Sequence, residues 1–350
     1  MSKKVRIGIV GVGGIGKVNA RALEANPRGE IVALCDILPE RMDEFEAELG
    51  RPTRKYADFR RLCRDREVDA IFVGTPNQVH VPPALAAVRN DKHVMCTKPL
   101  ADAAGPAKRL IPAAEKAGVV NMMSLSTRFG PAVRYLDGHV AKGFFGERYY
   151  ARARSIRRSG IPDWNEGFIE AGGGAFRDMG VHALDAAWWL LGMPRPIGAT
   201  GVAGAKFGPK GLGYWDFRVP PKRYWKRYAS DDYAGGFIRF EGGVGVQIES
   251  FWASHQPEEF QVELFGTKAG ASMSPLKLYT TVDGAPQDIS VGLPKGPSAW
   301  DHIAGHFIGC ILDGVECKAP LRHGLIVQLM LEAVLQSGRT GREVRVPEVK

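Results

Sequence analysis

The chain has 350 residues, a formal net charge of +9 and 45% hydrophobic residues. This length exceeds that of a typical single-core domain and predicts two domains, and the composition excludes a disordered chain. The basic residues are spread along the sequence rather than gathered on one segment, so a nucleic-acid-binding role is disfavoured.

The five cysteines include no CxxC pair, which disfavours a disulfide framework or a four-cysteine zinc site and suits a reducing compartment. The first residues lead directly into a strand-like segment and lack the long apolar region of a signal peptide. No apolar run is long enough to span a bilayer. We therefore expect a cytoplasmic protein with no membrane partner.

A glycine-rich turn follows the first strand-like segment. The apolar residues 5–10 (VRIGIV) run into Gly11-Val12-Gly13-Gly14-Ile15-Gly16, and residues 17–25 are compatible with a helix. This is GxGxxG in the context that a dinucleotide-binding turn requires, with a strand before it and a helix after it. Gly11 permits the tight turn, Gly13 allows close approach of a pyrophosphate, and Gly16 lets the helix pack on the strand. The free amides of the helix start then face the phosphates.

An acidic residue stands where a ribose-binding carboxylate is expected. The second apolar strand, residues 31–35, ends at Asp36, which follows Gly16 by twenty positions. A carboxylate here accepts hydrogen bonds from the adenosine ribose and repels a 2′-phosphate, which favours NAD over NADP. Arg41 is the residue that would favour NADP. The alternative role for Asp36 is to cap a helix that begins near Pro39.

Strands and helices continue to alternate through the first third of the chain. Strand-like runs at 70–74, 93–97 and 119–124 are separated by helical stretches that end near residue 88 and cover 103–117. This alternation predicts a Rossmann-type, doubly wound parallel sheet in an α/β domain over residues 1–127. Ligands of such sheets bind at the carboxyl ends of the strands. The predicted cofactor contacts at those ends are Thr75, Asn77, His80 and Lys98.

The pattern changes beyond residue 127. Runs at 148–155, 236–241, 244–252 and 261–265 alternate like antiparallel strands, and helices are predicted at 131–142 and 182–191. A last helix over 324–338 has a regular apolar face and is expected to pack against the rest of its domain. Residues 128–350 are therefore predicted to form an α+β domain with an open, mostly antiparallel sheet.

One segment of this second domain carries residues suited to acid–base chemistry. In residues 172–185 (GGGAFRDMGVHALD), three glycines precede a predicted helix with Asp178 and His182 four positions apart. That spacing puts a carboxylate and an imidazole on one helical face. His182 is suited to act as a general base, with Asp178 orienting it or relaying the proton. The alternative is a structural Asp–His hydrogen bond in a domain interface.

The glycine turn, Thr97-Lys98-Pro99 and the 172–185 segment together resemble the Gfo/Idh/MocA oxidoreductase family, and the resemblance spans nearly the whole chain. It implies that Lys98 binds both the nicotinamide ribose and the reacting hydroxyl, and that Asp178 and His182 are the family's catalytic pair. It also implies a homodimer or homotetramer assembled through the C-terminal sheet. One departure is Thr97, which stands where the family usually has a glutamate that touches the cofactor.

Three further residues are predicted on the substrate side. Arg128 follows the sixth strand and is expected to line the mouth of the site, while Asp163 and Trp164 precede the three glycines, where similar proteins place a substrate-facing tryptophan. An indole face beside a polar acceptor suits a sugar, and the alternative for Trp164 is packing. His302 and His306 are four apart, but with no HExxH motif or cysteine partner helix packing is favoured and no metal is expected.

Three functions compete at this point. The leading interpretation is an NAD-dependent dehydrogenase that moves a hydride between the nicotinamide and a secondary alcohol of a sugar, sugar derivative or cyclitol. The second is a glycoside hydrolase, lyase or epimerase that forms a keto-sugar intermediate and recycles NAD. The third, a catalytically silent NAD-binding regulator, is disfavoured by Lys98, Asp178 and His182.

Overall fold

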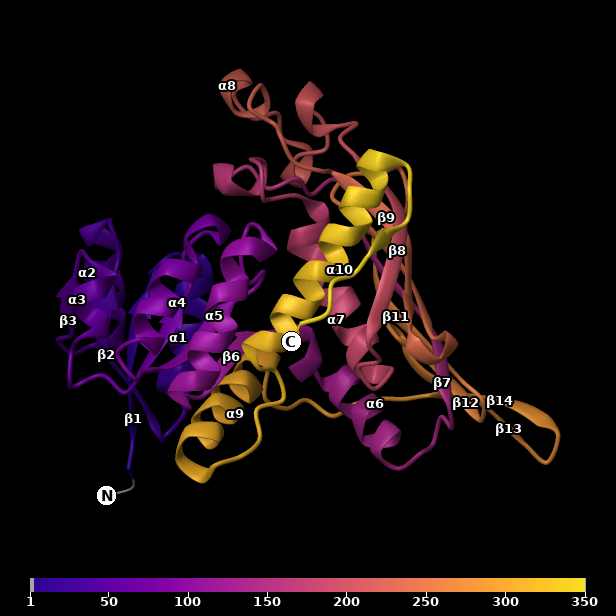
Figure 1. Cartoon of the computed structure of the whole chain (residues 1–350), viewed down its shortest axis with the longest axis horizontal. Coiled ribbons are helices and arrows are strands. Elements are labelled where there is room, and N and C mark those ends of the chain that lie inside the picture. Colours follow the sequence, from indigo (N-terminus) through magenta and orange to yellow (C-terminus); the bar gives the residue numbers. More distant parts are fainter. Residues whose placement is uncertain (1–2, 350) are drawn as a thin grey trace. The chain divides into compact units, whose positions relative to one another are not determined.

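The computed structural model describes residues 3–349, and its backbone contacts divide the chain into two compact units. The first unit ends at Ser126 and also contains Pro297–Leu325, whereas the second comprises Thr127–Gly296 and the chain from Ile326 onward. Figure 1 labels the elements of both units. Residues 297–325, which the sequence assigned to the second domain, therefore belong to the first unit.

The first unit is built on a six-stranded sheet in the order β3-β2-β1-β4-β5-β6, in which all neighbouring strands are parallel. The predicted doubly wound parallel sheet is thus confirmed. The strand order reverses between β1 and β4, and the carboxyl ends at such a switch point are where ligands of this fold bind. The strands are β1 (Val5–Val10), β2 (Gly29–Cys35), β3 (Arg54–Tyr56), β4 (Ala70–Val73), β5 (His93–Thr97) and β6 (Asn121–Ser124).

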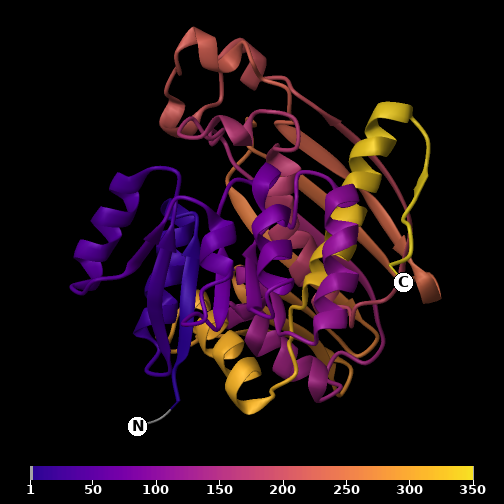
Figure 2. The same cartoon turned by 60° about the vertical axis from the view of Figure 1, so that its left-hand side comes forward.

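Helices cover both faces of this sheet (Figure 2). A Cβ atom at Gly8 would meet Leu62 on one face, whereas one at Gly29 would meet Leu23 and Ile308 on the other. The two faces are therefore closed by different helices, as a buried parallel sheet requires. The helices are α1 (Gly14–Ala25), α2 (Pro39–Leu49), α3 (Phe59–Cys63), α4 (Val81–Val88), α5 (Ala104–Ala117) and α9 (Ala299–Asp313).

Helix α9 explains why the late segment joins the first unit. Ile308 of α9 contacts the sheet side of Gly29, and Arg28 Nη1 lies 2.8 Å from Asp313 Oδ1. Beyond α9, the amide of Met123 donates to the carbonyl of Ala319 at 2.8 Å. The segment thus covers one face of the sheet and continues along its β6 edge. These contacts join residues far apart in the sequence, so no local pattern predicts them.

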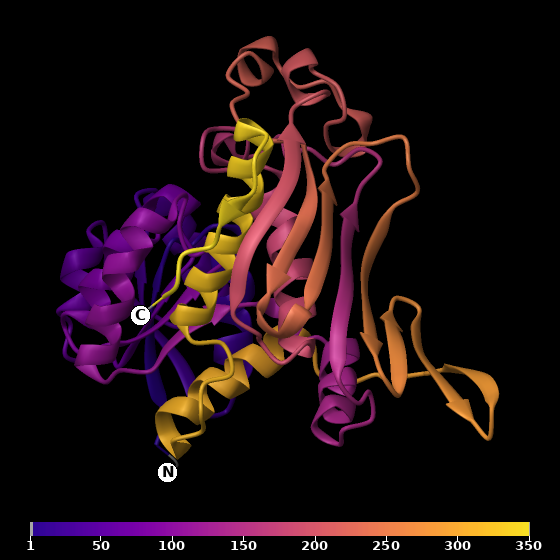
Figure 3. The ribbon, with the colours of Figure 1, turned by 45° about the vertical axis from the view of Figure 1, so that its right-hand side comes forward.

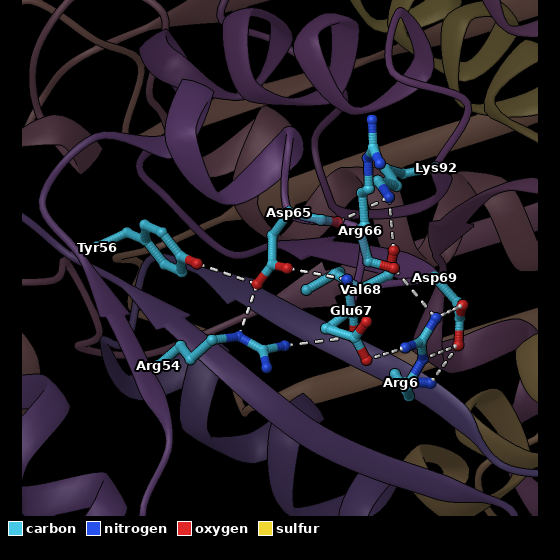
Figure 4. A network of polar contacts seen from close by, with 9 residues as sticks. All are labelled: Arg6, Arg54, Tyr56, Asp65, Arg66, Glu67, Val68, Asp69 and Lys92. Atoms are coloured by element: carbon cyan, nitrogen blue, oxygen red, sulfur yellow. Dashed lines mark hydrogen bonds and ion pairs between the residues drawn. The ribbon is translucent and has the colours of Figure 1, made fainter.

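A network of ion pairs ties the loop before β4 to the amino ends of the strands (Figure 4). One edge of the Arg6 guanidinium donates to the carboxylate of Asp69, through Nε at 3.0 Å and Nη2 at 2.8 Å. Arg54 Nε donates to Asp65 Oδ2 at 2.6 Å, and Lys92 Nζ donates to the carbonyl of Asp65 at 2.9 Å. These charges pair with one another at the amino edge of the sheet, opposite the carboxyl edge at which ligands of this fold bind.

The second unit contains a nine-stranded sheet in the order β14-β13-β12-β11-β7-β10-β9-β8-β15 (Figure 3). Only the β7–β10 pair is parallel, so the predicted open, mostly antiparallel sheet is confirmed. The strands are β7 (Arg148–Ile156), β8 (Pro196–Gly204), β9 (Tyr233–Phe240), β10 (Gly245–Phe251), β11 (Glu259–Gly266), β12 (Ala269–Met273), β13 (Leu276–Val282), β14 (Ala285–Ser290) and β15 (Val344–Arg345).

One face of this sheet is covered by α7 (Val181–Leu190) and α10 (Leu321–Thr340). A Cβ atom at Gly236 of β9 would contact Val334 of α10, and one at Gly180, just before α7, would contact Ser250 of β10. The other elements are α6 (Pro131–Ala141), α8 (Lys222–Trp225) and the short turns η1 (Asn77–Val79), η2 (Ser126–Phe129), η3 (Glu166–Phe168), η4 (Phe176–Gly180), η5 (Gly208–Lys210), η6 (Trp215–Phe217) and η7 (Glu241–Gly243).

A buried ion pair fixes α7 in the second unit. Arg128 donates through Nε to Asp185 Oδ2 at 3.2 Å and through Nη2 to Asp185 Oδ1. Its guanidinium also lies over the Trp189 ring, 4.4 Å from the centroid. Both charged side chains are 1% exposed. Burial raises the pKa of Asp185, which the Arg128 charge opposes, so removing Arg128 would leave a carboxylate without its compensating charge.

Among residues 3–349, no helix combines the length and the apolar character needed to cross a membrane.

Replacing Arg128 with methionine is expected to destabilise the protein by about 3–5 kcal/mol, because breaking a buried pair leaves the other charge uncompensated. Arg195, which pairs with Glu241 on the surface, provides a matched control, and Arg195→Met should change the free energy of unfolding far less, because exposed ion pairs contribute little. Urea unfolding of both variants measures the difference. Equal effects would contradict the structural role given to the Arg128–Asp185 pair.

Candidate functional site

Two glycines shape the turn between β1 and α1. Gly11 has φ +89°, and a Cβ atom on it would lie 2.7 Å from the backbone of Gly74. A Cβ atom on Gly16 would lie 1.9 Å from the carbonyl oxygen of Gly11. No side chain fits at either position, so the two glycines allow β1, the turn and α1 to approach as the sequence predicted.

The next part of the turn is open. A Cβ atom on Gly14 would meet nothing within 4 Å, and one on Gly13 would meet only Arg41 Nη1 at 3.8 Å. Ile15 is half-buried beside them. Helix α1 has no side-chain cap and no acidic residue in its first turn, so its first amides remain directed at this open space. The turn therefore fits the pyrophosphate of a dinucleotide, which needs bare backbone and the positive end of a helix.

Asp36 links the glycine turn to the end of β2. Its Oδ2 accepts a hydrogen bond from the Val12 amide at 2.7 Å, and its Oδ1 accepts one from the Leu38 amide at 3.0 Å. Arg41 Nη1 lies 4.0 Å from Asp36 Oδ2 and is half-exposed. The carboxylate thus keeps remaining acceptor capacity toward a ribose, with a cation close enough to modify its preference.

The ends of β4 and β5 are braced by a buried imidazole. His80 is 0% exposed, with Nε2 2.5 Å from the Thr75 carbonyl and Nδ1 2.8 Å from the Pro99 carbonyl. Burial lowers the pKa of His80, and the hydrogen bonds to the two carbonyls oppose this shift. The sequence predicted His80 as a cofactor contact, but both of its ring nitrogens are engaged by backbone carbonyls. These contacts connect Thr75 with Pro99.

Lys98 follows β5 directly and is half-buried at the carboxyl edge of the sheet. Thr97, where the family usually has glutamate, is buried. Of the residues predicted at this edge, Asn77 begins η1 after β4 and Lys98 directly follows β5, so both lie at the carboxyl ends of two neighbouring strands.

In the second unit, a buried carboxylate anchors the glycine segment. Asp231 accepts a hydrogen bond from the Phe176 amide at 2.8 Å, and its own carbonyl accepts one from Ala175 at 3.0 Å. Gly174 has φ +106°, and a Cβ atom there would lie 2.1 Å from Asp231 Oδ1. Only glycine therefore permits the carboxylate to reach the first amides of the helical segment.

The predicted helix over this segment begins instead as a π-turn. Residues Phe176–Gly180 form η4, in which the Val181 amide reaches the Phe176 carbonyl, and α7 continues from Val181. Such turns recur at functional sites because they displace one residue from the regular helix. Asp178 lies in the π-turn and His182 in the first turn of α7, and both are half-buried.

Asp178 has a partner that the sequence did not predict. Its Oδ2 accepts a hydrogen bond from the Trp252 indole Nε1 at 3.0 Å, and Trp252 is 0% exposed. The indole fixes the carboxylate from within the core of the second unit. The pairing joins the end of β10 to the π-turn across 74 positions, so only the folded chain reveals it.

Arg128 does not line an opening. The sequence placed it at the mouth of the site, but its side chain is 1% exposed and is committed to Asp185 and Trp189. Burying a guanidinium without an anionic partner costs too much free energy. Arg128 can be buried because it pairs with Asp185 on α7. Arg128 therefore supports the helix that carries His182.

Asp163 and Trp164 lie in an aromatic cluster of the second unit. Trp164 is 59% exposed, and its ring packs edge-on against Trp215 with centroids 5.4 Å apart. Arg157 lies over the Trp215 ring at 4.8 Å, and burial lowers the pKa of this guanidinium. Arg157 and Trp215 thus extend the cluster around the exposed Trp164.

A cluster of sulfur and nitrogen ligands lies in the first unit. His306, Cys310 and Cys317 each place a ligand atom within 4.8 Å of the other two. The sequence predicted that His302 and His306 pack on a helix and, without a cysteine partner, bind no metal. Cys310 follows His306 by four residues of α9, a spacing that the sequence does contain, but the return of Cys317 depends on the loop after the helix. All five cysteines are free thiols in the structure.

A parallel sheet with this glycine turn and switch point defines a dinucleotide-binding protein. Comparison with protein families identifies which one. Residues 5–125 match the model of the oxidoreductase family with an NAD-binding Rossmann fold, GFO_IDH_MocA, and residues 133–272 match the GFO/IDH/MocA C-terminal domain. The chain belongs to the Gfo/Idh/MocA family of NAD-binding oxidoreductases.

Two curated proteins are similar over nearly the whole chain. D-glucoside 3-dehydrogenase of Escherichia coli is 28% identical over 99% of this chain and 98% of that protein. The scyllo-inositol 2-dehydrogenase (NAD(+)) of Bacillus subtilis is 25% identical over 99% of this chain and 97% of that protein. Among solved structures, levoglucosan dehydrogenase in complex with NADH and levoglucosan has the same fold, with a TM-score of 0.84, 21% identity and coverage of 99% and 100% of the two chains.

The anchor at Asp231 predicts a pH-dependent stability. Burial raises the pKa of this carboxyl to about 6, and the Phe176 amide and the Arg177 charge only partly oppose the shift. The folded chain therefore keeps a proton that the unfolded chain has already released, so stability declines as the pH rises toward and through about 6. The shift is equivalent to roughly 2–3 kcal/mol.

Asp231→Asn keeps an acceptor for the Phe176 amide but removes this titration. Relative to the variant, the native chain is expected to lose stability between about pH 5 and about pH 7.5, as measured by urea unfolding at both values. A stability difference that stays constant over this range would show that Asp231 does not titrate there.

Proposed function

We propose that the chain catalyses hydride transfer between NAD and a secondary alcohol of a sugar, sugar derivative or cyclitol. The observation that carries the proposal is the open glycine turn at Gly13 and Gly14 together with Asp178 and His182 on a π-turn and helix. The relatives named for glucosides, inositols and levoglucosan support this substrate class.

The catalytic roles are assigned to Lys98, Asp178 and His182. The bound nicotinamide supplies the acceptor for the hydride that leaves the carbinol carbon. The hydroxyl loses its proton as the carbonyl forms, and His182 is proposed as the base that takes it. Lys98 polarises the oxygen in this assignment. In the alternative assignment the two roles are swapped, so that Lys98 accepts the proton and His182 polarises the oxygen. Asp178, which accepts a hydrogen bond from the Trp252 indole, is proposed to orient His182.

Asp163, Trp164 and Arg157 are proposed as contacts of the substrate. The exposed indole of Trp164 presents an apolar face suited to sugar C–H groups. Asp163 Oδ1 accepts from Arg218 at 3.2 Å and retains acceptor capacity for a hydroxyl. Arg128 is no longer proposed as a contact, because its guanidinium is buried against Asp185.

The cofactor contacts are proposed to be the turn residues Gly11, Gly13, Gly14, Ile15 and Gly16, with Asp36 on the ribose. Thr75, Asn77 and Lys98 complete the set, and His80 supports them from beneath. NAD is proposed over NADP because the Asp36 carboxylate repels a 2′-phosphate.

An assembly through the nine-stranded sheet is also proposed. The face opposite α7 and α10 carries Arg154, which pairs with Glu259 and Glu263, and Arg152, which lies over Phe265. A sheet face that mixes paired charges with aromatic rings suits a partner with the same surface, as in a homodimer or homotetramer. A cytoplasmic location is also proposed, and the free thiols support it.

The first test mixes the protein with NAD and a panel of glycosides, sugars, sugar acids and inositols and follows NADH absorbance. Steady NADH formation with one substrate group supports the dehydrogenase. Altered substrate without net NADH would identify the NAD-recycling hydrolase, lyase or epimerase instead.

His182→Asn should lower kcat by about 10²–10⁴-fold while NADH affinity is kept, since the base acts in the chemical step. Lys98→Met should depress turnover as strongly; native-like turnover in either variant contradicts its role.

Cofactor choice is tested at Asp36. Asp36→Ala removes the ribose acceptor and the bond to the Val12 amide, so NAD affinity should fall by about 10–150-fold, equivalent to a charged hydrogen bond of about 1.5–3 kcal/mol. NADP affinity should fall less or rise. Fluorescence titration with NADH and NADPH measures the two affinities. Arg41→Ala is the control that shows how much of the cofactor preference comes from the neighbouring cation. Tighter binding of NADPH than NADH by the native chain would overturn the assignment of NAD.

A further inference from the structure

His306, Cys310 and Cys317 converge in the first unit, and each places one ligand atom within 4.8 Å of the others. The sulfur of Cys310 lies 3.6 Å from Nε2 of His306. In a tetrahedral zinc site with bonds of about 2.3 Å to sulfur and about 2.0 Å to nitrogen, two such ligand atoms are about 3.6 Å apart. This edge of the cluster therefore already has the separation of two ligands that share a metal ion.

The fold brings the three ligands together with little freedom. His306 and Cys310 are one turn apart on α9, so they project from the same helical face. The helix ends at Gly314, whose φ of +67° turns the chain back toward Cys317. The loop is then fastened to β6, because Cys317 Sγ lies 3.5 Å from the Asn121 carbonyl and the Ala319 carbonyl accepts from Met123. The third ligand is thus held on ordered backbone.

We propose that His306, Cys310 and Cys317 form a binding site for a soft divalent cation, for which Zn²⁺ is the best match. Two thiolates and an imidazole are ligands typical of zinc, whereas Mg²⁺ and Ca²⁺ require oxygen. Three protein ligands leave one coordination position for water or a solute, and His306 and Cys317 are only half-buried, so the position is accessible. The ion would clamp α9 to the loop along the β6 edge and so stabilise the first unit.

Two contacts must be exchanged when the cation binds. The Lys318 amide donates to Nε2 of His306 at 2.9 Å and uses the lone pair that would coordinate the metal. The Cys317 thiol donates to the Asn121 carbonyl at 3.5 Å, and this hydrogen bond is lost when the thiols release their protons to solvent and bind the cation as thiolates. Hydrogen bonds therefore hold the cluster together without an ion, and the cation replaces these two. Binding is expected to be weaker than in a zinc finger, whose ligands have no such competing donor.

The test is a titration of the reduced, chelator-treated full chain with Co²⁺ under anaerobic conditions. One equivalent should produce thiolate-to-cobalt charge-transfer absorption and the visible bands of a tetrahedral site, and Zn²⁺ should abolish both. Cys317→Ser and His306→Gln should weaken Co²⁺ binding by at least about 100-fold, since each removes a ligand. Cys63→Ser is the matched control, because Cys63 is a buried thiol of the same unit that lies outside the cluster and donates to the Pro83 carbonyl, and it should bind Co²⁺ like the native chain.

Zn²⁺ should also raise the Tm of the native chain and of Cys63→Ser but not that of Cys317→Ser, because only a ligand that binds the folded state stabilises it. Absence of the charge-transfer band, or the same band in Cys317→Ser, would overturn the proposal. So would recovery of Cys310 and Cys317 as a disulfide with no cobalt affinity, which would make the pair a redox couple. None of these readouts depends on dehydrogenase activity.

Discussion

Buried carboxylates that accept hydrogen bonds from backbone amides hold the functional loops of both units. Asp36 accepts hydrogen bonds from the amides of Val12 and Leu38, and Asp231 accepts one from the amide of Phe176. Asp232 accepts hydrogen bonds from the amides of residues 206–208. Each interaction satisfies backbone donors that lie outside regular strands and α-helices, and at Asp231 the close approach depends on Gly174. These hydrogen bonds therefore help to position the glycine turn, the π-turn and the loop after β8, together with apolar packing such as that of the buried Phe176 and Met179.

The parts of the fold that the sequence predicted are those fixed by local chemistry. Gly11 and Gly16 must be glycines because of backbone contacts within one strand–turn–helix unit, and the alternation of short apolar strands with helices suffices to predict a parallel sheet. Strands β13 and β14 were missed because most of their residues are half-exposed or exposed, whereas β8 (PIGATGVAG) and β12 (AGASM) consist largely of glycine and alanine, which give a weak strand signal. The π-turn at Asp178 was predicted as a regular helix, since a single inserted residue leaves no trace in periodicity.

The candidate site was predicted by residue type but not by environment. Asp178 and His182 follow from their spacing, whereas the Trp252 indole that holds Asp178 comes from a strand far along the chain. Arg128 and His80 were expected to face ligands because they follow strand ends. Burial reversed both expectations: Arg128 is neutralised by Asp185, and His80 is engaged by two carbonyls. Exposure is a property of the whole fold, so the sequence cannot assign it.

The return of residues 297–325 to the first unit bears on the order in which the chain is made. Synthesis delivers the six strands of the parallel sheet long before α9, whose Ile308 covers the β2 face, and before Ala319, which bonds to β6. Until then part of the sheet and one of its edges stay uncovered, and contacts across such sequence distances form slowly. The nucleotide-binding unit, although first to leave the ribosome, is therefore completed only after most of the other unit has been translated.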